Sequence, residues 1–473
     1  MTEQRALAAA LTRIEQVMQL VRERTAARVY PPGARVPSIR RMAAACGVAR
    51  STVVEAYDRL VGEGVLVSRP GSGFYVAGAG AAWMAEREPR RDREVDPFWI
   101  MHQALAAPPD GTLSPGCGWL PADWLPDSAI RRHLRAVARD PGADLVNYGP
   151  PLGHGPLRGQ LSRRLAERGV VADPDGILLT DSATAAIDLV CRTLLRPGDA
   201  VLIDDPCYYN FRSMLATHHV RVHGVPYNPD GPDLDAFAGA AQALSPRLYV
   251  TTASIHNPTG GALSPAKAHR LLTLADRHDI AIVEDDIFAD FLADAPPRLA
   301  ALDGLQRVAY VGSFSKTLSA SVRCGFVAAR PDLIERMVDI KLATSFGNAD
   351  LSARLVHALL ADGSYRRHVE AIRTRLAPLM ARTLERLAEA RLTPWLRPRG
   401  GLFVWAMLPE GLDSAAVARA ALAENIVLAP GNVFSVGQTA GRFLRFNVAQ
   451  SADPRIFAVL RRLIASAAAA RGG

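Results

Sequence analysis

Residues 311–325, with the sequence VGSFSKTLSASVRCG, indicate the fold of most of this chain. They follow a short β-rich run and contain one of only three lysines among 473 residues. A lysine at a strand end, beside hydroxyl groups and an arginine, has the neighbours that an aldehyde cofactor with a phosphate group needs. The amine of Lys316 would form a Schiff base. The hydroxyls of Ser313 and Ser315, together with Arg323, would hold the phosphate dianion.

Outward from this loop, residues from about 140 to 350 alternate short β-rich runs with helical patterns. Five such runs are Ile177–Thr180, Ala200–Ile203, Leu248–Thr252, Ile280–Val283 and Val308–Val311. The alternation predicts an α/β lobe with a mainly parallel sheet covered by helices. From about residue 365 to 473, a helix and shorter strands at Phe403–Leu408 and Arg442–Asn447 predict a small C-terminal α+β lobe.

A second phosphate-binding segment is suggested where the first of these strands leads into a helix. Ser182, Ala183 and Thr184 begin that helix. Backbone N–H groups at a helix N-terminus can bind a phosphate group. An ordinary capped helix would explain the same residues, and the sequence leaves both interpretations open.

Four further residues at predicted strand ends suit a pyridine ring or an amino acid. Tyr208 could stack on such a ring, although a packing tyrosine is the common alternative. Asn257, within HNPTG at 256–260, could hydrogen-bond a ring hydroxyl. Asp285 could keep the ring nitrogen protonated, which makes the ring an electron sink. Arg445 could pair bidentately with a carboxylate.

The first 80 residues form a separate, basic region. They carry 11 arginines against 6 acidic residues, a surplus of 5, whereas the whole chain has 55 basic and 47 acidic residues. Such a surplus indicates nucleic acid as a partner, with a solvated basic face as the alternative.

Two helices and a hairpin are predicted in this basic region. Helices at residues 37–46 and 50–63 are joined by a turn at Gly47, and residues 65–76 form the hairpin. The second helix has a polar N-terminus, which suits insertion into a major groove of DNA, and the hairpin would be a wing beside it. The residues expected to contact DNA are Arg40, Arg50, Ser51, Thr52 and Ser72.

Composition divides the chain into three parts. Residues 1–77 hold the basic region, and residues 78–97, with small residues, mixed charge and two prolines, read as a linker. Residues 98–473 hold the two lobes described above.

Several classes of protein are disfavoured by composition. The five cysteines have neither zinc nor disulfide spacing, so we expect reduced thiols and no metal site. The sequence contains no run of about 18 uncharged apolar residues, so we expect no membrane span. The charged N-terminal residues are not followed by an apolar signal core, so we expect a cytoplasmic protein.

Residues 31–76, PPGARVPSIRRMAAACGVARSTVVEAYDRLVGEGVLVSRPGSGFYV, resemble the winged helix-turn-helix of GntR-type bacterial regulators. The resemblance implies that this segment binds double-stranded DNA. One position departs from the family pattern, because Ala49 stands where a serine usually caps the recognition helix. Loss of such a cap costs about 0.5–2 kcal/mol.

Residues from about 95 to 473 resemble the fold-type-I aminotransferases that use pyridoxal 5′-phosphate. The matching segments are YGPPLG at 148–153, SAT at 182–184, HNPTG at 256–260, SFSK at 313–316 and Arg445. The resemblance implies that Lys316 is the internal aldimine lysine and that Tyr148 reaches the phosphate in the partner subunit of a homodimer. It also implies phosphate contacts from Ser182, Ala183, Thr184, Ser313 and Arg323, stacking by Tyr208, ring contacts from Asn257 and Asp285, and carboxylate binding by Arg445.

Phe288 departs from the aminotransferase pattern. These enzymes often carry a tyrosine at this position, and its hydroxyl also binds the ring oxygen. The phenylalanine therefore affects the expectation of turnover more than the expectation of cofactor binding.

The combination of the two parts resembles the MocR subfamily of GntR-type regulators over residues 5–470. It implies a bacterial transcriptional regulator, associated with the nucleoid when bound to DNA, that senses pyridoxal phosphate, an amino acid or an amine. The alternative is a catalytically active aminotransferase with a fused DNA-binding domain. The sequence identifies neither the effector, the operator and regulated genes nor the sign of regulation.

Overall fold

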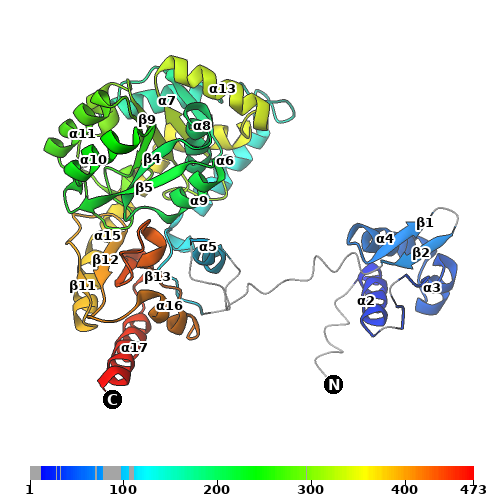
Figure 1. Cartoon of the computed structure of the whole chain (residues 1–473). Helices are drawn as coiled ribbons and strands as arrows, with labels where there is room; N and C mark the ends of the chain where they lie inside the picture. Colours follow the sequence, from blue (N-terminus) through cyan, green and yellow to red (C-terminus); the bar gives the residue numbers. More distant parts are fainter. Residues whose placement is uncertain are drawn as a thin grey trace. The chain divides into compact units, whose positions relative to one another are not determined.

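The structure is a computed structural model that describes residues 12–27, 29–31, 33–69, 72–77, 97–105, 111–294 and 296–472. The chain divides into two compact units, Met1–Asp92 and Arg93–Gly473 (Figure 1). Except for Pro97, the expected linker at 78–97 lies outside the described residues.

The described part of the first unit contains three helices and one hairpin. They are α2 (Arg13–Ala26), α3 (Ile39–Cys46), α4 (Arg50–Gly62), β1 (Leu66–Arg69) and β2 (Gly73–Val76). The helix predicted from residue 37 begins at Ile39, because Ser38 caps it by accepting a hydrogen bond from the N–H of Arg41. Gly47 ends this helix in the left-handed region, with φ of 64°, which a residue without Cβ adopts without strain.

One face of α4 forms the core of the first unit. Val53, Ala56, Tyr57 and Leu60 are spaced three to four residues apart and are buried against α2, α3 and the hairpin. The Tyr57 hydroxyl donates a hydrogen bond to the Pro37 carbonyl oxygen at 2.8 Å. The opposite face of α4 is left exposed, as a recognition helix requires.

The second unit is built around an eight-stranded sheet in the order β3-β10-β9-β8-β7-β4-β5-β6. The strands are β3 (Ile177–Thr180), β4 (Ala200–Asp205), β5 (Arg221–Asn228), β6 (Gly231–Pro232), β7 (Leu248–Thr251), β8 (Ala281–Asp285), β9 (Val308–Ser313) and β10 (Gly325–Ala328). All five predicted strands are present. Sequence analysis missed β5, β6 and β10; of these, β10 runs antiparallel to both of its neighbours.

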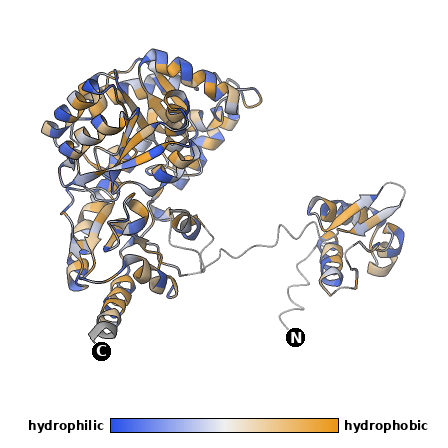
Figure 2. Ribbon diagram, viewed as in Figure 1, coloured by the Kyte–Doolittle hydropathy of each residue, from blue (hydrophilic) through white to orange (hydrophobic). Residues whose placement is uncertain are grey.

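Helices cover both faces of this sheet. They are α6 (Asp127–Arg139), α7 (Gly155–Ala166), α8 (Ala183–Leu194), α9 (Tyr209–Thr217), α10 (Leu234–Leu244), α11 (Pro265–Arg277), α12 (Leu299–Asp303), α13 (Pro331–Ser345) and α14 (Asp350–Ala361), whereas α5 (Pro97–Leu105) packs against α9 and the small lobe. In Figure 2 these helices carry hydrophilic and hydrophobic residues on the same ribbon. Such a pattern is typical of helices that bury one side.

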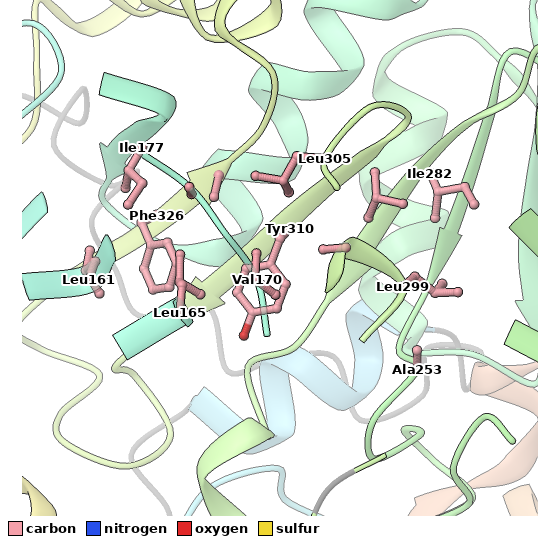
Figure 3. Packing of buried hydrophobic residues seen from close by; sticks show 14 of the residues in the cluster. Leu161, Leu165, Val170, Ile177, Ala253, Ile282, Leu299, Leu305, Tyr310 and Phe326 are labelled. Carbon is pink, nitrogen blue, oxygen red and sulfur yellow. The ribbon is translucent and has the colours of Figure 1, made fainter. Parts of the chain in front are cut away.

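Alternate side chains of each central strand enter two separate cores. In β4, Leu202 packs in one core, whereas Val201 and Ile203 pack in the core on the opposite face. Figure 3 shows part of the first core, where the rings of Tyr310 and Phe326 have centroids 6.2 Å apart. A sheet buried on both faces leaves the strand ends as the places where polar groups gather.

The small lobe packs a four-stranded antiparallel sheet against helices. It contains α15 (Ser364–Glu389), β11 (Thr393–Pro394), β12 (Phe403–Met407), α16 (Ser414–Leu422), β13 (Ala429–Pro430), β14 (Phe443–Asn447) and α17 (Pro454–Gly472). The structure thus confirms the predicted fold class, a winged helix-turn-helix with an α/β domain and a small α+β lobe. Among the described residues, no helix is both long enough and apolar enough to cross a membrane.

Candidate functional site

A pocket of about 240 Å³ lies at the carboxyl ends of the central strands, next to the start of α8. Parallel strands place the residues that follow them at one edge of the sheet, which explains why distant segments meet there. Nine predicted residues line the pocket: Ser182, Ala183, Thr184, Tyr208, Asp285, Ser313, Ser315, Lys316 and Arg323.

Lys316 and Asp285 both have shifted pKa values in this pocket. Burial and the charge of Arg445 together lower the pKa of Lys316 to about 8, while the charge of Asp285 opposes both effects. Burial also raises the pKa of Asp285 to about 7, although this carboxylate accepts a hydrogen bond from the Ile287 N–H at 3.3 Å. An amine with a pKa near 8 is partly neutral at physiological pH and can act as a nucleophile.

The loop before Lys316 is held by its own hydroxyl groups. The Ser313 hydroxyl lies 3.0 Å from the Ser315 hydroxyl and accepts a hydrogen bond from the Ser315 N–H at 3.1 Å. The chain returns to the sheet through Arg323, whose φ of 50° is in the left-handed region. Both serine hydroxyls and the Arg323 side chain line the same pocket.

The start of α8 forms the opposite wall of the pocket. Ser182 is the N-cap, and its hydroxyl accepts a hydrogen bond from the Ala185 N–H at 3.0 Å. Gly325 lies against this turn, because a Cβ there would be 2.6 Å from the Ser182 carbonyl carbon and 2.8 Å from the Ala183 nitrogen. The glycine therefore lets the lysine loop and the helix start approach each other closely.

These residues fit the cofactor that the sequence suggested. Amide and hydroxyl groups at a helix start, with Arg323 nearby, are suited to a phosphate dianion. A lysine of lowered pKa is suited to an aldehyde, and a buried carboxylate is suited to a protonated pyridine nitrogen. The donor set around the pocket thus matches the phosphate, the aldehyde and the ring nitrogen of pyridoxal phosphate.

Asn257 and Arg445 are not among the residues that line the pocket, and they contact each other. Nη1 of Arg445 donates a hydrogen bond to Oδ1 of Asn257 at 2.8 Å, and Nη2 donates to the Gly116 carbonyl oxygen at 2.7 Å. The guanidinium lies 4.4 Å from the ring centroid of Phe403 and 4.9 Å from that of Phe434. Sequence reasoning treated Asn257 and Arg445 separately and missed their shared environment.

The aromatic residues Tyr208 and Phe288 have different surroundings. Tyr208 lines the pocket, and its ring centroid is 4.7 Å from that of Tyr209. Phe288 is buried, with its ring edge-on to Phe403 at 5.2 Å. Phe288 thus occupies the place of the usual tyrosine, makes apolar contacts there and offers no hydroxyl.

Tyr148 does not line the pocket of its own chain. Its side chain is 83% exposed and stacks on Phe346, which is 64% exposed, with the ring centroids 5.5 Å apart. Two large exposed aromatic rings in contact form an apolar surface of the kind that a partner protein covers.

The sequence did not predict the apolar residues of the pocket wall, among them three that precede α6. Met101 and Leu105 come from α5, and Trp119 comes from the segment before α6. The available signal was the run of apolar residues in α5, which directly follows the expected linker. Its spacing gave no indication of the pocket that it contacts.

The residues expected to contact DNA lie on the surface of the first unit. Arg40, Arg50 and Ser51 are exposed, and Thr52 is half-buried at the start of α4. Ala49 occupies the N-cap of α4 and makes no side-chain hydrogen bond there. Ser72, the hairpin residue, lies with its hydroxyl 2.6 Å from the Tyr75 hydroxyl, so a DNA contact would have to share this hydrogen bond.

Two families match separate parts of the chain. Residues 122–463 match the aminotransferase class I and II family. Residues 13–76 match the gntR family of bacterial regulatory proteins.

Individual relatives support both assignments. An uncharacterized HTH-type transcriptional regulator of Escherichia coli, YdcR, is 30% identical, and the match covers 93% of this chain and 95% of the relative. The 2-aminoadipate transaminase of Thermus thermophilus is 33% identical over 73% of this chain and 88% of the enzyme. The crystal structure of LysN, an alpha-aminoadipate aminotransferase also from Thermus thermophilus, complexed with N-(5'-phosphopyridoxyl)-L-leucine, is 28% identical with a TM-score of 0.72, over 78% of this chain and 95% of LysN.

Fold, site and relatives define a class of protein in which a GntR-type DNA-binding unit is joined to an aminotransferase domain. The aminotransferase domain is of the kind that binds pyridoxal 5′-phosphate, which is the cofactor of this chain. The chain belongs to the MocR subfamily of GntR-type regulators.

Proposed function

We propose that this protein is a DNA-binding transcriptional regulator that senses pyridoxal phosphate, together with an amino acid or amine, in its aminotransferase-like domain. The observation that carries the proposal is the pocket around Lys316, with its matched donors, in the same chain as a GntR-type unit. A relative that covers the whole arrangement is named as an HTH-type transcriptional regulator.

The pocket residues take separate roles in this proposal. Lys316 would bind the aldehyde carbon of the cofactor, and Asp285 would hold the proton on the ring nitrogen. Phosphate is held by Ser182, Ala183, Thr184, Ser313, Ser315 and Arg323. When bound, pyridoxal phosphate supplies a carbonyl group that condenses with amines and a ring that withdraws electrons.

The positions of Tyr208, Asn257 and Arg445 suggest how an effector is recognised. Tyr208 would pack against the ring of the cofactor, and Asn257 would hydrogen-bond the ring oxygen. Arg445 would hold the effector carboxylate, and its buried guanidinium lies close to the rings of Phe403 and Phe434. Nε of Arg445 is buried and has no hydrogen-bond partner among the described residues, so a ligand carboxylate that reached it would satisfy this donor.

A homodimer is part of the proposal. Tyr148 does not line the pocket of its own chain and is strongly exposed beside Phe346. In a symmetric pair, the same surface of each subunit contacts the other. Tyr148 then contributes its hydroxyl to the cofactor phosphate of the partner. Sedimentation of the cofactor-loaded protein at micromolar concentration should give a dimer.

Sensing requires that ligand binding and DNA binding are coupled. A ligand changes the affinity for DNA only by its difference in affinity between two arrangements of the protein, and a tenfold difference corresponds to about 1.4 kcal/mol. Regulation is then a shift between arrangements of the two units in the bacterial cytoplasm, where the protein is nucleoid-associated when bound to DNA.

Active transamination is the second candidate function. A specific observation favours it, since a 2-aminoadipate transaminase is 33% identical to this chain. Against turnover, Phe288 lacks the hydroxyl that would help to hold the ring oxygen. Incubation with amino acids, followed by detection of pyridoxamine phosphate, distinguishes an enzyme from a regulator that only binds its effector.

Titrations of the protein's own promoter region test the regulator proposal. The affinity for DNA, the DNA bend and transcription are measured with and without pyridoxal phosphate and amino acids. We expect at least one of the three to change with ligand. If none changes, the sensing proposal is wrong and the fused enzyme takes its place.

A further inference from the structure

A second pocket, of about 560 Å³, lies between α7, the end of α14 and the start of α15. It shares no lining residue with the pocket around Lys316. Five arginines line it, namely Arg163, Arg164, Arg168, Arg366 and Arg373, and we call it the arginine pocket. Three acidic residues also line it, so its formal charge is +2 (5 − 3).

Asp290, in the 3-10 helix Ala289–Phe291, is the central acidic residue of the arginine pocket. Arg164 and Arg168 both donate to the same carboxylate oxygen of Asp290, and Arg373 donates to its backbone oxygen at 2.7 Å. Although burial acts to raise the pKa of Asp290, the charges of Arg168 and Arg164 outweigh it and hold the pKa below its usual value.

The acidic residues do not neutralise this cluster. Asp290 supplies one negative charge to three guanidinium groups, and Arg366 is paired with Glu370 on the exposed rim. Arg163 makes no ion pair with any described residue, and Glu167 likewise has none. Positive charge of this kind, gathered in a recess, attracts an anion. Guanidinium forks bind phosphate and carboxylate with two parallel hydrogen bonds.

We propose that the arginine pocket binds a small dianion, most simply a phosphate monoester or inorganic phosphate. The side chains of Arg164 and Arg168 lie mostly inside the recess but remain 24% and 17% exposed. A ligand small enough to enter the recess can therefore reach them. Gln160 also lines the pocket, and its buried Oε1 has no hydrogen-bond partner among the described residues. This acceptor suits the O–H of monohydrogen phosphate.

The arginine pocket is connected to the cofactor lysine through one tyrosine. The Tyr365 hydroxyl lies 2.6 Å from Oδ2 of Asp290 and 2.5 Å from the hydroxyl of Thr317, the residue that follows Lys316. The ring of His368 contacts the Thr317 carbonyl oxygen at 2.7 Å, again from α15. An anion that draws the arginines away from Asp290 therefore alters the hydrogen bonds beside Lys316, and the two sites are coupled.

Calorimetry with inorganic phosphate tests the arginine pocket. The full-length protein is first saturated with pyridoxal phosphate, so that the cofactor's own phosphate site is filled. We expect one further phosphate per subunit, with affinity reduced at least tenfold (about 1.4 kcal/mol) by Arg373→Gln. Arg163→Gln, at an exposed position with no ion pair to lose, should reduce the affinity with the fold intact. Arg382→Gln, exposed on the same helix α15 and outside the pocket, is the matched control and should change nothing.

A second titration separates this proposal from the proposed function. Arg323→Gln weakens only the cofactor's phosphate site, so its phosphate binding at the arginine pocket should persist even if the protein fails to bind pyridoxal phosphate. Absence of the extra phosphate, or equal binding in the Arg163 and Arg373 variants and wild type, overturns the proposal. It is also overturned if these variants lose only affinity for duplex DNA, because the arginines would then be a nucleic-acid contact.

The coupling between the arginine pocket and the cofactor site is tested by a separate measurement. In wild type, saturating phosphate should shift the absorption spectrum of the bound cofactor or change cofactor affinity. Tyr365→Phe removes the hydroxyl shared by Asp290 and Thr317. This variant should still bind phosphate, and the spectral response should be lost. A response that persists unchanged in Tyr365→Phe contradicts the proposed connection.

Discussion

The two units of this chain expose their functional groups to very different surroundings. On the first unit, Arg40, Arg50 and Ser51 stand in water at the surface of α3 and α4. In the second unit, Asp285 is only 3% exposed, and both it and Lys316 have strongly shifted pKa values. The first unit therefore presents exposed basic and polar groups to a large partner, whereas the second holds buried groups whose charge depends on their surroundings.

This difference leads to different sensitivities. Contacts between exposed arginines and DNA phosphates release counterions, so they weaken steeply as salt rises. Buried groups are screened much less by salt and respond instead to pH and to a bound ligand. Mutations in the second unit should thus change ligand binding by large factors, whereas mutations in the first should change DNA binding by smaller ones.

The largest effect is expected from Lys316→Ala. Without the amine, the cofactor should no longer be fixed to the chain by borohydride reduction, and peptide mapping should find no label. The variant should still bind DNA, since Lys316 belongs to the other unit, and this binding should no longer respond to pyridoxal phosphate or amino acids. Lys267→Ala is the matched control, because Lys267 pairs with Asp230 at 2.8 Å outside the pocket. Label on Lys267 or Lys341 in wild type would contradict the assignment.

Asp285→Asn should have the next largest effect and a dependence on pH. Loss of the carboxylate should weaken cofactor binding by about a hundredfold, or about 2.7 kcal/mol. In the cofactor-free protein, by contrast, the substitution should stabilise the fold relative to wild type as pH rises. The pKa of Asp285 is raised to about 7 in the folded state, so wild type loses stability as pH rises through 7 and this buried group ionises.

Thermal unfolding at several pH values tests the expected direction of the change in stability with pH. Between pH 5 and pH 8, the melting temperature of cofactor-free Asp285→Asn should rise relative to that of wild type. With cofactor bound, the order should reverse, because the charged carboxylate then has the pyridinium as its partner. A constant difference at all pH values would mean that Asp285 does not ionise in this range.

The strand-end residues of the second unit were predictable because local sequence places them. Asp285 ends a buried strand, Lys316 and Ser182 each follow one, and the carboxyl ends of parallel strands converge. Short apolar runs ended by polar residues were enough to predict this convergence. Strand β10 was missed because its four residues, Gly325–Ala328, directly follow the lysine loop and lack an independent turn signal.

Contacts that depend on distant packing were not predictable in the same way. Arg445 meets Asn257 and Gly116 across 188 and 329 residues of sequence, and no periodic pattern records such a meeting. The same holds for Tyr365, which lies 75 residues from Asp290 and 48 from Thr317. Sequence reasoning identified the chemistry of Arg445, whereas the neighbours of its guanidinium required the three-dimensional structure.

A moderate effect is expected from Arg50→Ala in the first unit. If Arg50 contacts a base, the substitution should cost about 1–3 kcal/mol and relax specificity at one position of the operator. If it contacts phosphate, affinity should fall uniformly across sequences, and the slope of affinity against salt should decrease by about one unit. Operator titrations at several salt concentrations separate these outcomes. Unchanged affinity in a folded variant would remove Arg50 from the interface.

The smallest effect is expected from Ala49→Ser, which adds the missing cap to α4. Ala49 has φ and ψ of −67° and 152°, and Ser38, which caps α3, has nearly the same values of −60° and 154°. A serine at 49 can therefore accept a hydrogen bond from the first turn of α4 without a change of backbone. The first unit should gain about 0.5–2 kcal/mol of stability, with Ser38→Ala as the converse control, which should lose a similar amount.

Because Arg50, Ser51 and Thr52 lie in the capped turn, DNA affinity should rise as well if fraying of that turn limits binding. Denaturant unfolding measures the first effect and operator titration the second. A gain in stability with unchanged affinity would mean that fraying of the first turn of α4 does not limit DNA binding.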